Sequence, residues 1–524
     1  MILLKPHFRI KLQRQRTNLL GIPVRHKKFL ILFLAVLLFP GIQYAGDLSP
    51  RSRLNEGIQS VYNFEFDKAE SIFSTLLKKN PNDLFANHFS GTISFWKYFG
   101  SNKKKYFDEF LHQSDATIAK AEQSLSDNPK NKETLFILGS EYGYRAIAFG
   151  KAEKFLDMIW ASKKSNSYLE DVLEIDSNYY DAYLGIGLIK FALSQVPSGF
   201  KWALAMIGFD GDSEKGLAYL KISAEKGNYS KVEAEYYLSQ LYAEFYFDYD
   251  KAKTHLAQLN KRFPENLLFK YSFAVIEVKN RNLVSAENLL LPLEKEKNSE
   301  FDQLLALSKF LLADVYYYEN NFEKAKDYYS RFLSETKEKN YSGIANYRMA
   351  ICNEFENESE KSKDYFNSAQ HGNELLDDDY YAKKKSEIYL KRNITEVEKT
   401  LIFSTNLLEQ KRYDTAIDSL SRLLDNNQSQ NIFAQGYLLL SEAYYYKNNF
   451  DSSLFFARKA FGEKGKSESW INPFAYYFAS ASSLKKNDKE KAKYYFEKAD
   501  DFSNFYYENK LKSMLKNLGR FVNN

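Results

Sequence analysis

The sequence contains very little cysteine, proline or glycine. Its 524 residues include one cysteine, 10 prolines and 22 glycines. A single cysteine excludes an internal disulfide framework and a zinc cluster built on thiolates. Cys352 is not accompanied by a histidine or acid motif, so we interpret it as a buried, unreactive thiol. So few turn-forming residues favour long helices with short turns over a β-sandwich.

Motifs for catalysis and metal binding are also missing. There is no G-x-S-x-G, and no histidine stands at H-x-x-x-H or H-E-x-x-H spacing. We therefore predict a protein that is not an enzyme and holds no cofactor or metal. Paired catalytic carboxylates stay open as an alternative, because sequence distance hides pairs that the fold brings together. The six histidines are His7, His26, His88, His112, His255 and His371.

The first 45 residues differ from the rest of the chain. Residues 1–28 contain eight lysines or arginines and no acid, and the apolar run FLILFLAVLLFPGIQYAGD (29–47) follows. This order predicts a secretory signal over residues 1–45, with Ala45 near the cleavage site. The protein is then exported, periplasmic or associated with the outer membrane of a bacterium. The alternative is an uncleaved inner-membrane anchor formed by residues 29–42, the only membrane contact that we predict.

The basic charge of the chain belongs to this segment. The whole sequence has 73 lysines and arginines against 68 acids, a net charge of +5. Without residues 1–45, 65 basic residues face 68 acids. The remaining chain has no electrostatic signature of a nucleic-acid partner.

Self-similar segments repeat along the chain. Each has a polar turn, then a small residue, then a large apolar residue four positions later. Apolar residues spaced by three and four predict helices, and the short turns make successive helices antiparallel neighbours. Four such segments are YYYENNFEKAKDYYSRFL (316–333), LLEQKRYDTAIDSLSRLL (407–424), YYYKNNFDSSLFFARKAF (444–461) and SLKKNDKEKAKYYFEKAD (483–500).

The small residues mark where the two helices of a pair cross closely. They recur at intervals of 34 to 39 residues in most of the array. They are Ala69, Ala252, Ala286, Ala325, Ala416, Ser453 and Ala492, with a degenerate copy at Ser362.

This pattern resembles the tetratricopeptide repeat (TPR), whose period is about 34 residues. Two copies match its signature well: Leu312, Ala313, Tyr316, Ala325, Tyr329 and Phe332; and Tyr437, Leu440, Ser441, Tyr444, Ser453, Ala457 and Ala460. The resemblance covers nearly all of residues 50–505. It implies an all-α fold, a right-handed superhelical solenoid of antiparallel helix pairs.

The repeat phase also predicts the organisation of the chain. After the signal, we expect an N-terminal TPR-like block over 46–230 with a helical insertion at 194–216. A central array (231–366), an irregular helical connector (367–398) and a C-terminal array (399–524) follow. In the connector, we expect the acidic run 377–379 and the lysine run 383–385 to be solvated.

The stretch VPSGFKWALAMIGFDGDSEKGL (196–217) interrupts the repeats. It lacks the spacing of a phosphate loop, and Lys215 and Lys221 stand where a calcium loop needs glycine and glutamate. We expect an apolar insertion, with Asp212 or Ser213 capping the next helix. The insertion carries Phe200, Trp202, Leu204, Met206 and Ile207. GFDGDSEKGL also resembles the GF-GDRE-GL signature of the eukaryotic TPR family that includes the inclusion-body clearance proteins.

The TPR resemblance implies a binding function. In such proteins the first helix of each pair lines a concave groove that holds a protein or peptide ligand. Carried over by phase, the groove residues are Leu307, Phe310, Asp314, Tyr317, Gln435, Leu438, Glu442, Tyr445, Phe474 and Tyr477. The predicted function is a non-catalytic scaffold of the bacterial cell envelope. The alternatives are a passive structural spacer, or a binder of a glycan, lipid or small ligand in the groove.

Overall fold

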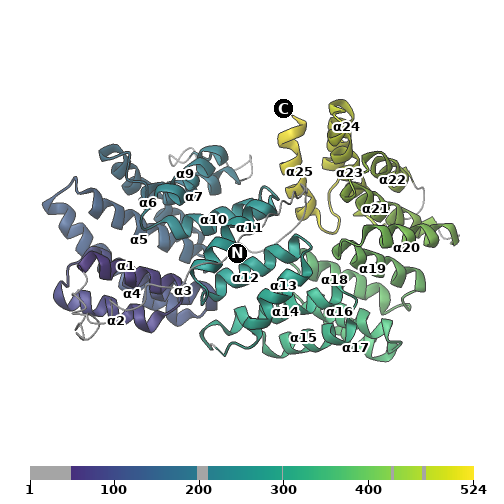
Figure 1. The fold of residues 1–524 in the computed structure, drawn as a ribbon, viewed down its shortest axis with the longest axis horizontal. Helices are drawn as coiled ribbons and strands as arrows, with labels where there is room; N and C mark the ends of the chain where they lie inside the picture. The colour runs from purple at the N-terminus through teal and green to yellow at the C-terminus, as the bar shows by residue number, and fades with distance from the viewer. Residues whose placement is uncertain (1–48, 197–209, 298, 427–429, 463–467, 524) are drawn as a thin grey trace, which may run out of the picture.

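The computed structural model describes residues 49–196, 210–297, 299–426, 430–462 and 468–523, without the side chains of 426 and 430–432. These residues form 24 α-helices and one short 3₁₀ helix, and none of them lies in a strand (Figure 1). The predicted all-α solenoid of helix pairs is confirmed. The predicted signal and the five apolar residues of the insertion lie outside the described residues.

The N-terminal block contains four helix pairs. Each helix packs most closely on its sequence neighbour. The pairs are α1 (Pro50–Tyr62) with α2 (Phe66–Lys79), α3 (Leu84–Ser101) with α4 (Lys104–Asp127), α5 (Lys132–Lys151) with α6 (Phe155–Ile175), and α7 (Ala182–Ser194) with α9 (Ser213–Lys226).

The central array also contains four pairs. They are α10 (Lys231–Glu244) with α11 (Tyr249–Arg262), α12 (Leu267–Lys279) with α13 (Leu283–Glu294), α14 (Asp302–Tyr318) with α15 (Phe322–Glu335), and α16 (Ser342–Phe355) with α17 (Ser359–Ala369). The 3₁₀ helix η2 (Ser299–Phe301) leads into α14.

The C-terminal part begins with a single helix, α18 (Asp377–Tyr389), and ends with another, α25 (Glu508–Val522). Between them lie α19 (Glu396–Glu409) with α20 (Tyr413–Asn426), α21 (Gln430–Tyr446) with α22 (Phe450–Gly462), and α23 (Ile471–Lys485) with α24 (Lys489–Asp500).

The small residues lie at the helix crossings, as the repeat phase predicts. Every one of them has no exposed surface, because the facing helix covers it completely. A larger side chain there would force the two helices apart. The fully buried set is Ala69, Ala252, Ala286, Ala325, Ser362, Ala416, Ser453 and Ala492.

The polar turns have a common construction that explains their asparagines. Asn320 and Asn448 adopt left-handed backbone conformations, with φ of 60° and 61°. Asparagine tolerates this conformation better than most residues. The next residue caps the second helix: Asn321 Oδ1 accepts a hydrogen bond from Lys324 N, and Asn449 Oδ1 accepts one from Ser452 N. The turn therefore reverses the chain and begins a helix within three residues.

The charged runs of the connector are not simply solvated, contrary to the sequence-based expectation. Asp379 is 1% exposed and accepts hydrogen bonds from the backbone N–H groups of Tyr341, Ile344 and Asn373. Lys385 is 6% exposed and pairs with Glu468. Helix α18 packs on α16 and α17, so one face of each charged run is turned into the protein. Burial raises the pKa of Asp379 to about 6, against the effect of its backbone donors.

Candidate functional site

The predicted groove residues of the central array lie on α14 and are mostly covered. Phe310 is 6% exposed, and its ring stacks on Tyr341 with centroids 5.0 Å apart. Asp314 accepts a 2.6 Å hydrogen bond from the Tyr329 hydroxyl, and burial raises its pKa. Tyr317 is also buried, whereas Leu307 is half-buried.

The groove residues of the C-terminal array have similar surroundings. Leu438, Phe474 and Tyr477 are buried. Gln435, Glu442 and Tyr445 are half-buried. The Tyr445 ring meets Phe450 and Phe478 edge-on, with centroids 5.7 Å apart in both pairs, and burial raises its pKa to about 12. The structure does not test whether these ten residues bind a partner, and that stays a prediction.

The first helix of a pair is buried on more sides than the second. In α10, twelve consecutive residues, 232–243, are buried. In α15, a second helix, only Ala325, Tyr329 and Phe332 are buried. A helix packed on one side buries a single stripe, so α10 must be covered all round. The inner face of the array is therefore occupied by other parts of the chain.

At the N-terminal end, α1 and α5 contact α10, and α1 also contacts the residue before α12. The Tyr62 hydroxyl donates a 3.0 Å hydrogen bond to Glu233 on α10, and the Tyr144 hydroxyl donates to the same carboxylate oxygen. Burial raises the pKa of Glu233, which is 4% exposed. Asn266, at the start of α12, donates to the carbonyl of Tyr62 at 2.7 Å.

At the C-terminal end, Arg281 joins the central array to the C-terminal array. From the turn between α12 and α13, it donates to both oxygens of Glu409 at 3.1 Å and to Glu442 at 2.5 Å. Its guanidinium lies 4.4 Å from the centre of the Tyr446 ring. Burial disfavours the charged form, but Glu409, Tyr446 and Glu442 outweigh this effect and hold the pKa of Arg281 well above its ordinary value. We call these four residues the Arg281 joint.

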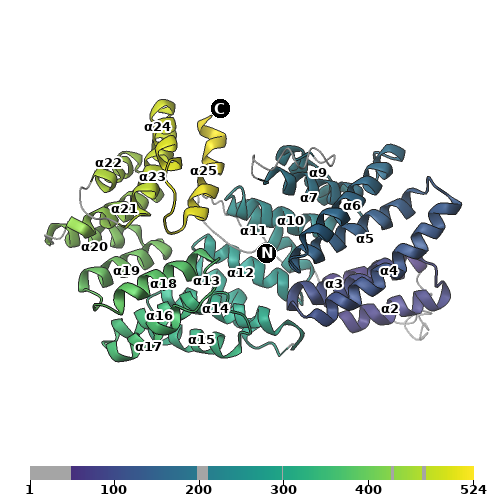
Figure 2. The ribbon, with the colours of Figure 1, turned by 180° about the vertical axis from the view of Figure 1, so that it is seen from behind.

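Other contacts near the Arg281 joint also connect the central array to the C-terminal array. Asn406 of α19 and Gln410, which follows this helix, donate to the carbonyls of Tyr317 and Tyr318 at 2.9 and 2.6 Å. Helix α25 stands between the C-terminal array and α10–α11 (Figures 1 and 2). Its Arg520 lies 3.9 Å from the centre of the Tyr246 ring. The last described helix therefore contacts the loop between α10 and α11.

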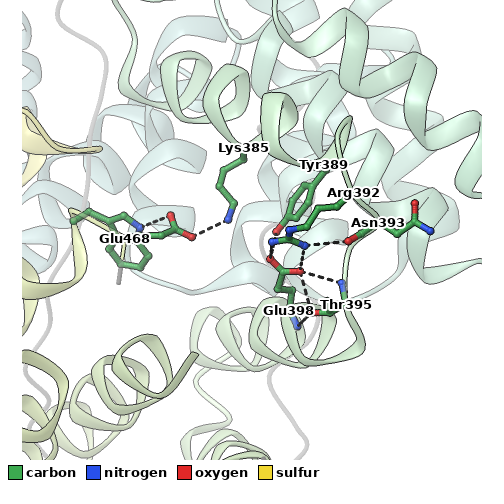
Figure 3. Close-up of polar contacts among 8 residues, drawn as sticks. Lys385, Tyr389, Arg392, Asn393, Thr395, Glu398 and Glu468 are labelled. Atoms are coloured by element: carbon green, nitrogen blue, oxygen red, sulfur yellow. Dashed lines mark hydrogen bonds and ion pairs between the residues drawn. The ribbon is translucent and has the colours of Figure 1, made fainter. Parts of the chain in front are cut away.

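A second polar junction connects α18 to later helices (Figure 3). Lys385 donates to Glu468, ahead of α23, at 2.8 Å. Arg392 donates to both oxygens of Glu398 at 2.7 and 2.8 Å. Glu398 also completes a capping box with Thr395 at the start of α19. Burial opposes ionisation of Glu398, but Arg392 and Thr395 outweigh it and lower its pKa to about 2.

Residues 210–217, the described C-terminal end of the stretch 196–217, lead into α9 where it packs on α7. Asp212 caps α9 by accepting from the backbone N–H groups of Glu214 and Lys215 at 3.0 and 2.9 Å, which confirms one of the two predicted caps. A Cβ on Gly216 would lie 2.8 Å from the carbonyl oxygen of Gly187 on α7. Glycines at both positions let α7 and α9 pack backbone to backbone. The GDSEKG segment is thus explained by packing and capping.

Sequence analysis missed one exposed apolar surface. Phe155, Leu156 and Trp160 begin α6 and are 57%, 85% and 52% exposed. The sequence does indicate this surface. At helical spacing, Leu156, Ile159 and Trp160 fall on the side of α6 opposite its buried stripe of Ala161, Ser165 and Leu169.

Two findings concern other kinds of site. Within the described ranges, no group of three or more His, Cys, Asp or Glu residues is placed to hold a metal ion. Among the helices that the structure describes, none combines the length and apolar character needed to span a bilayer.

Residues 175–393, less than half of the chain, match the family model Iml2/Tetratricopeptide repeat protein 39. The resemblance inferred from residues 196–217 is confirmed, because they lie inside this range. The chain is a TPR protein that resembles this family.

Solved TPR structures are also similar to the chain. The P58(IPK) TPR domain is 11% identical, covering 91% of this chain and 99% of its own, with a TM-score of 0.21. Yeast Tom70 is 12% identical over 90% and 96%, with a TM-score of 0.25. A tetratricopeptide repeat protein from Parabacteroides merdae is 16% identical over 56% and 99%, with a TM-score of 0.24. TM-scores this low carry no argument about the arrangement of the helices.

Proposed function

We propose that this protein is a non-catalytic TPR scaffold of the bacterial cell envelope that binds a protein partner. The repeated helix pair is the observation that carries the proposal. TPR-type repeats are generally non-catalytic, and the fold suggests a protein-interaction scaffold. The basic segment and apolar run of residues 1–45 support export as part of the same proposal.

The buried polar groups at the described inner contacts are consistent with a non-catalytic role. Glu233 receives two tyrosine hydroxyls, Asp314 pairs with Arg348 and Tyr329, and Arg281 pairs with two glutamates. A catalytic acid or base must reach a substrate. These groups instead connect one helix to another within the chain.

The experiment is a crosslinked capture from envelope extract, with residues 46–524 as bait and mass spectrometry as the readout. Leu307 and Gln435 belong to the predicted groove and are half-buried, so Leu307→Arg and Gln435→Arg perturb it with less risk to folding than Phe310 or Tyr477. The matched control is Phe455→Ser on α22, whose side chain is 53% exposed.

We expect one discrete protein to be captured by the unmodified bait and by the Phe455 variant, and to be lost with the two arginine variants. Capture of the same protein by every bait would overturn binding at the predicted groove. Capture of no specific protein would overturn the scaffold proposal and support a passive spacer. Export is tested separately, by fractionating cells that express the full chain.

A further inference from the structure

The start of α6 presents apolar side chains to solvent in a way that the rest of the helix does not. Leu156 is 85% exposed, although burial of a leucine side chain is ordinarily favourable. Trp160 meets Tyr142 edge-on at 5.4 Å, which leaves half of its surface open. Phe155, the first residue of α6, is exposed as well, so three large apolar side chains are open to solvent within the first six residues of the helix.

Two lysines lie on the next turn of this helix. Lys163 is exposed, and Lys164 lies 5.7 Å from the centre of the Trp160 ring. Lys154 precedes the helix, but its ammonium lies 5.2 Å from the centre of the Phe107 ring on α4. We call Phe155, Leu156 and Trp160, together with Lys163 and Lys164, the α6 tip.

Charge changes sign along α6. Residues 155–164 contain two lysines and one acid, whereas residues 165–175 contain three acids and no base. The three acids are Glu170, Asp171 and Glu174. A negatively charged surface would therefore attract the tip and repel the far end of the helix.

We propose that the α6 tip docks onto the surface of an anionic lipid bilayer. Aromatic rings with apolar bodies and a polar N–H are favoured at the level of the lipid headgroups, where Trp160 would lie. Leu156 and Phe155 bury apolar surface below it, and Lys163 and Lys164 meet the lipid phosphates. This proposal concerns a different surface from the predicted groove and does not depend on a protein partner.

The first experiment measures co-sedimentation with vesicles. The bait is residues 46–524, which contain every described helix and lack the apolar run that would itself enter a bilayer. Vesicles of phosphatidylcholine alone are compared with vesicles that also contain phosphatidylglycerol. Leu156→Glu is the test variant, since so exposed a side chain contributes little to folding. Phe455→Glu is the control, because Phe455 is 53% exposed and also has a lysine, Lys459, near its ring.

We expect binding to the anionic vesicles, at least about tenfold weaker for Leu156→Glu and unchanged for Phe455→Glu. Binding should also weaken as salt screens the lysines. Equal binding to neutral vesicles, or equal loss in both variants, would overturn the proposal. So would a shift in oligomeric state caused by Leu156→Glu without any vesicle binding, because the tip would then be a contact between copies of the chain.

A second readout is local to the tip and uses the same bait, residues 46–524. Tryptophan emission should shift to shorter wavelength when anionic vesicles are added, because Trp160 enters a less polar environment. The same shift should be absent in Trp160→Phe. A shift that persists in this variant would place the inserted tryptophan elsewhere and overturn the proposal.

Discussion

Replacing Arg281 with methionine should separate the central and C-terminal arrays. Methionine retains much of the length and apolar body of the arginine but donates no hydrogen bonds. The substitution removes three hydrogen bonds to Glu409 and Glu442. It also leaves two carboxylates, 13% and 18% exposed, without their shared cation.

The size of the effect follows from this geometry. Removing one partner of a buried ion pair typically costs about 3–5 kcal/mol, because the remaining charge is desolvated and uncompensated. Both glutamates retain some contact with water, which places the expected loss near the lower end, about 3 kcal/mol. Arg331 is the matched control: it pairs with Glu294, but its side chain is 35% exposed. Arg331→Met should therefore cost only about 0–1 kcal/mol.

Urea unfolding measures the total loss, and hydrogen exchange locates it. The Arg281 variant should exchange faster at the turns after α12 and α19, where the joint connects the arrays, while α1–α6 stay protected. Adding Glu409→Gln and Glu442→Gln should restore part of the stability, since the uncompensated charges are then gone. An Arg281 variant as stable as the Arg331 control, with unchanged exchange at both turns, would refute this account of the joint.

Three further predictions test other contacts. Glu398→Gln should lower the free energy of unfolding by about 1–2 kcal/mol at pH 7. The pKa of Glu398 in the folded protein is about 2, against an ordinary value of 4.5, so its stabilisation is present above about pH 4.5 and is lost as the pH falls toward 2. Urea unfolding of both proteins across that pH range would measure this loss. Gly216→Val should lower stability by about 2–3 kcal/mol by pushing against Gly187, whereas Gly462→Ala, whose Cβ would meet no atom of the described residues within 4 Å, should leave the melting temperature unchanged. Tyr445→Ala should lower the melting temperature, since its ring packs on two other aromatic rings; an unchanged melting temperature would show that this packing contributes little to stability.

The repeat period predicted the local architecture because it reports contacts between sequence neighbours. Ala325 and Ser453 mark helix crossings a few residues from a turn, so their spacing is visible in the sequence. Asp212 could be identified as a possible cap for the same reason, since it acts on residues two and three positions later.

Contacts between distant repeats were not predictable in this way. Arg281 and Glu409 are 128 residues apart, and no local pattern distinguishes them from solvated charges. Asp379 illustrates the same limit: within its acidic run it looks like its neighbours, but its side chain accepts hydrogen bonds from the backbone at the start of α16, 35 and 38 residues earlier. Such contacts depend on the superhelical curvature of the array. That curvature is the sum of small rotations between successive helix pairs.

The contacts that cover the predicted groove residues also affect how a ligand could bind there. A peptide that binds beside Tyr317 or Glu442 has to displace contacts that α19 and Arg281 already make. The apparent affinity is then reduced by the fraction of molecules that are open. Arg281→Met raises that fraction, so it should strengthen capture of a groove ligand while weakening the fold. A partner that binds the outer surface gains nothing from opening, and its capture should stay constant or fall. The sign of the change in capture therefore distinguishes the two surfaces.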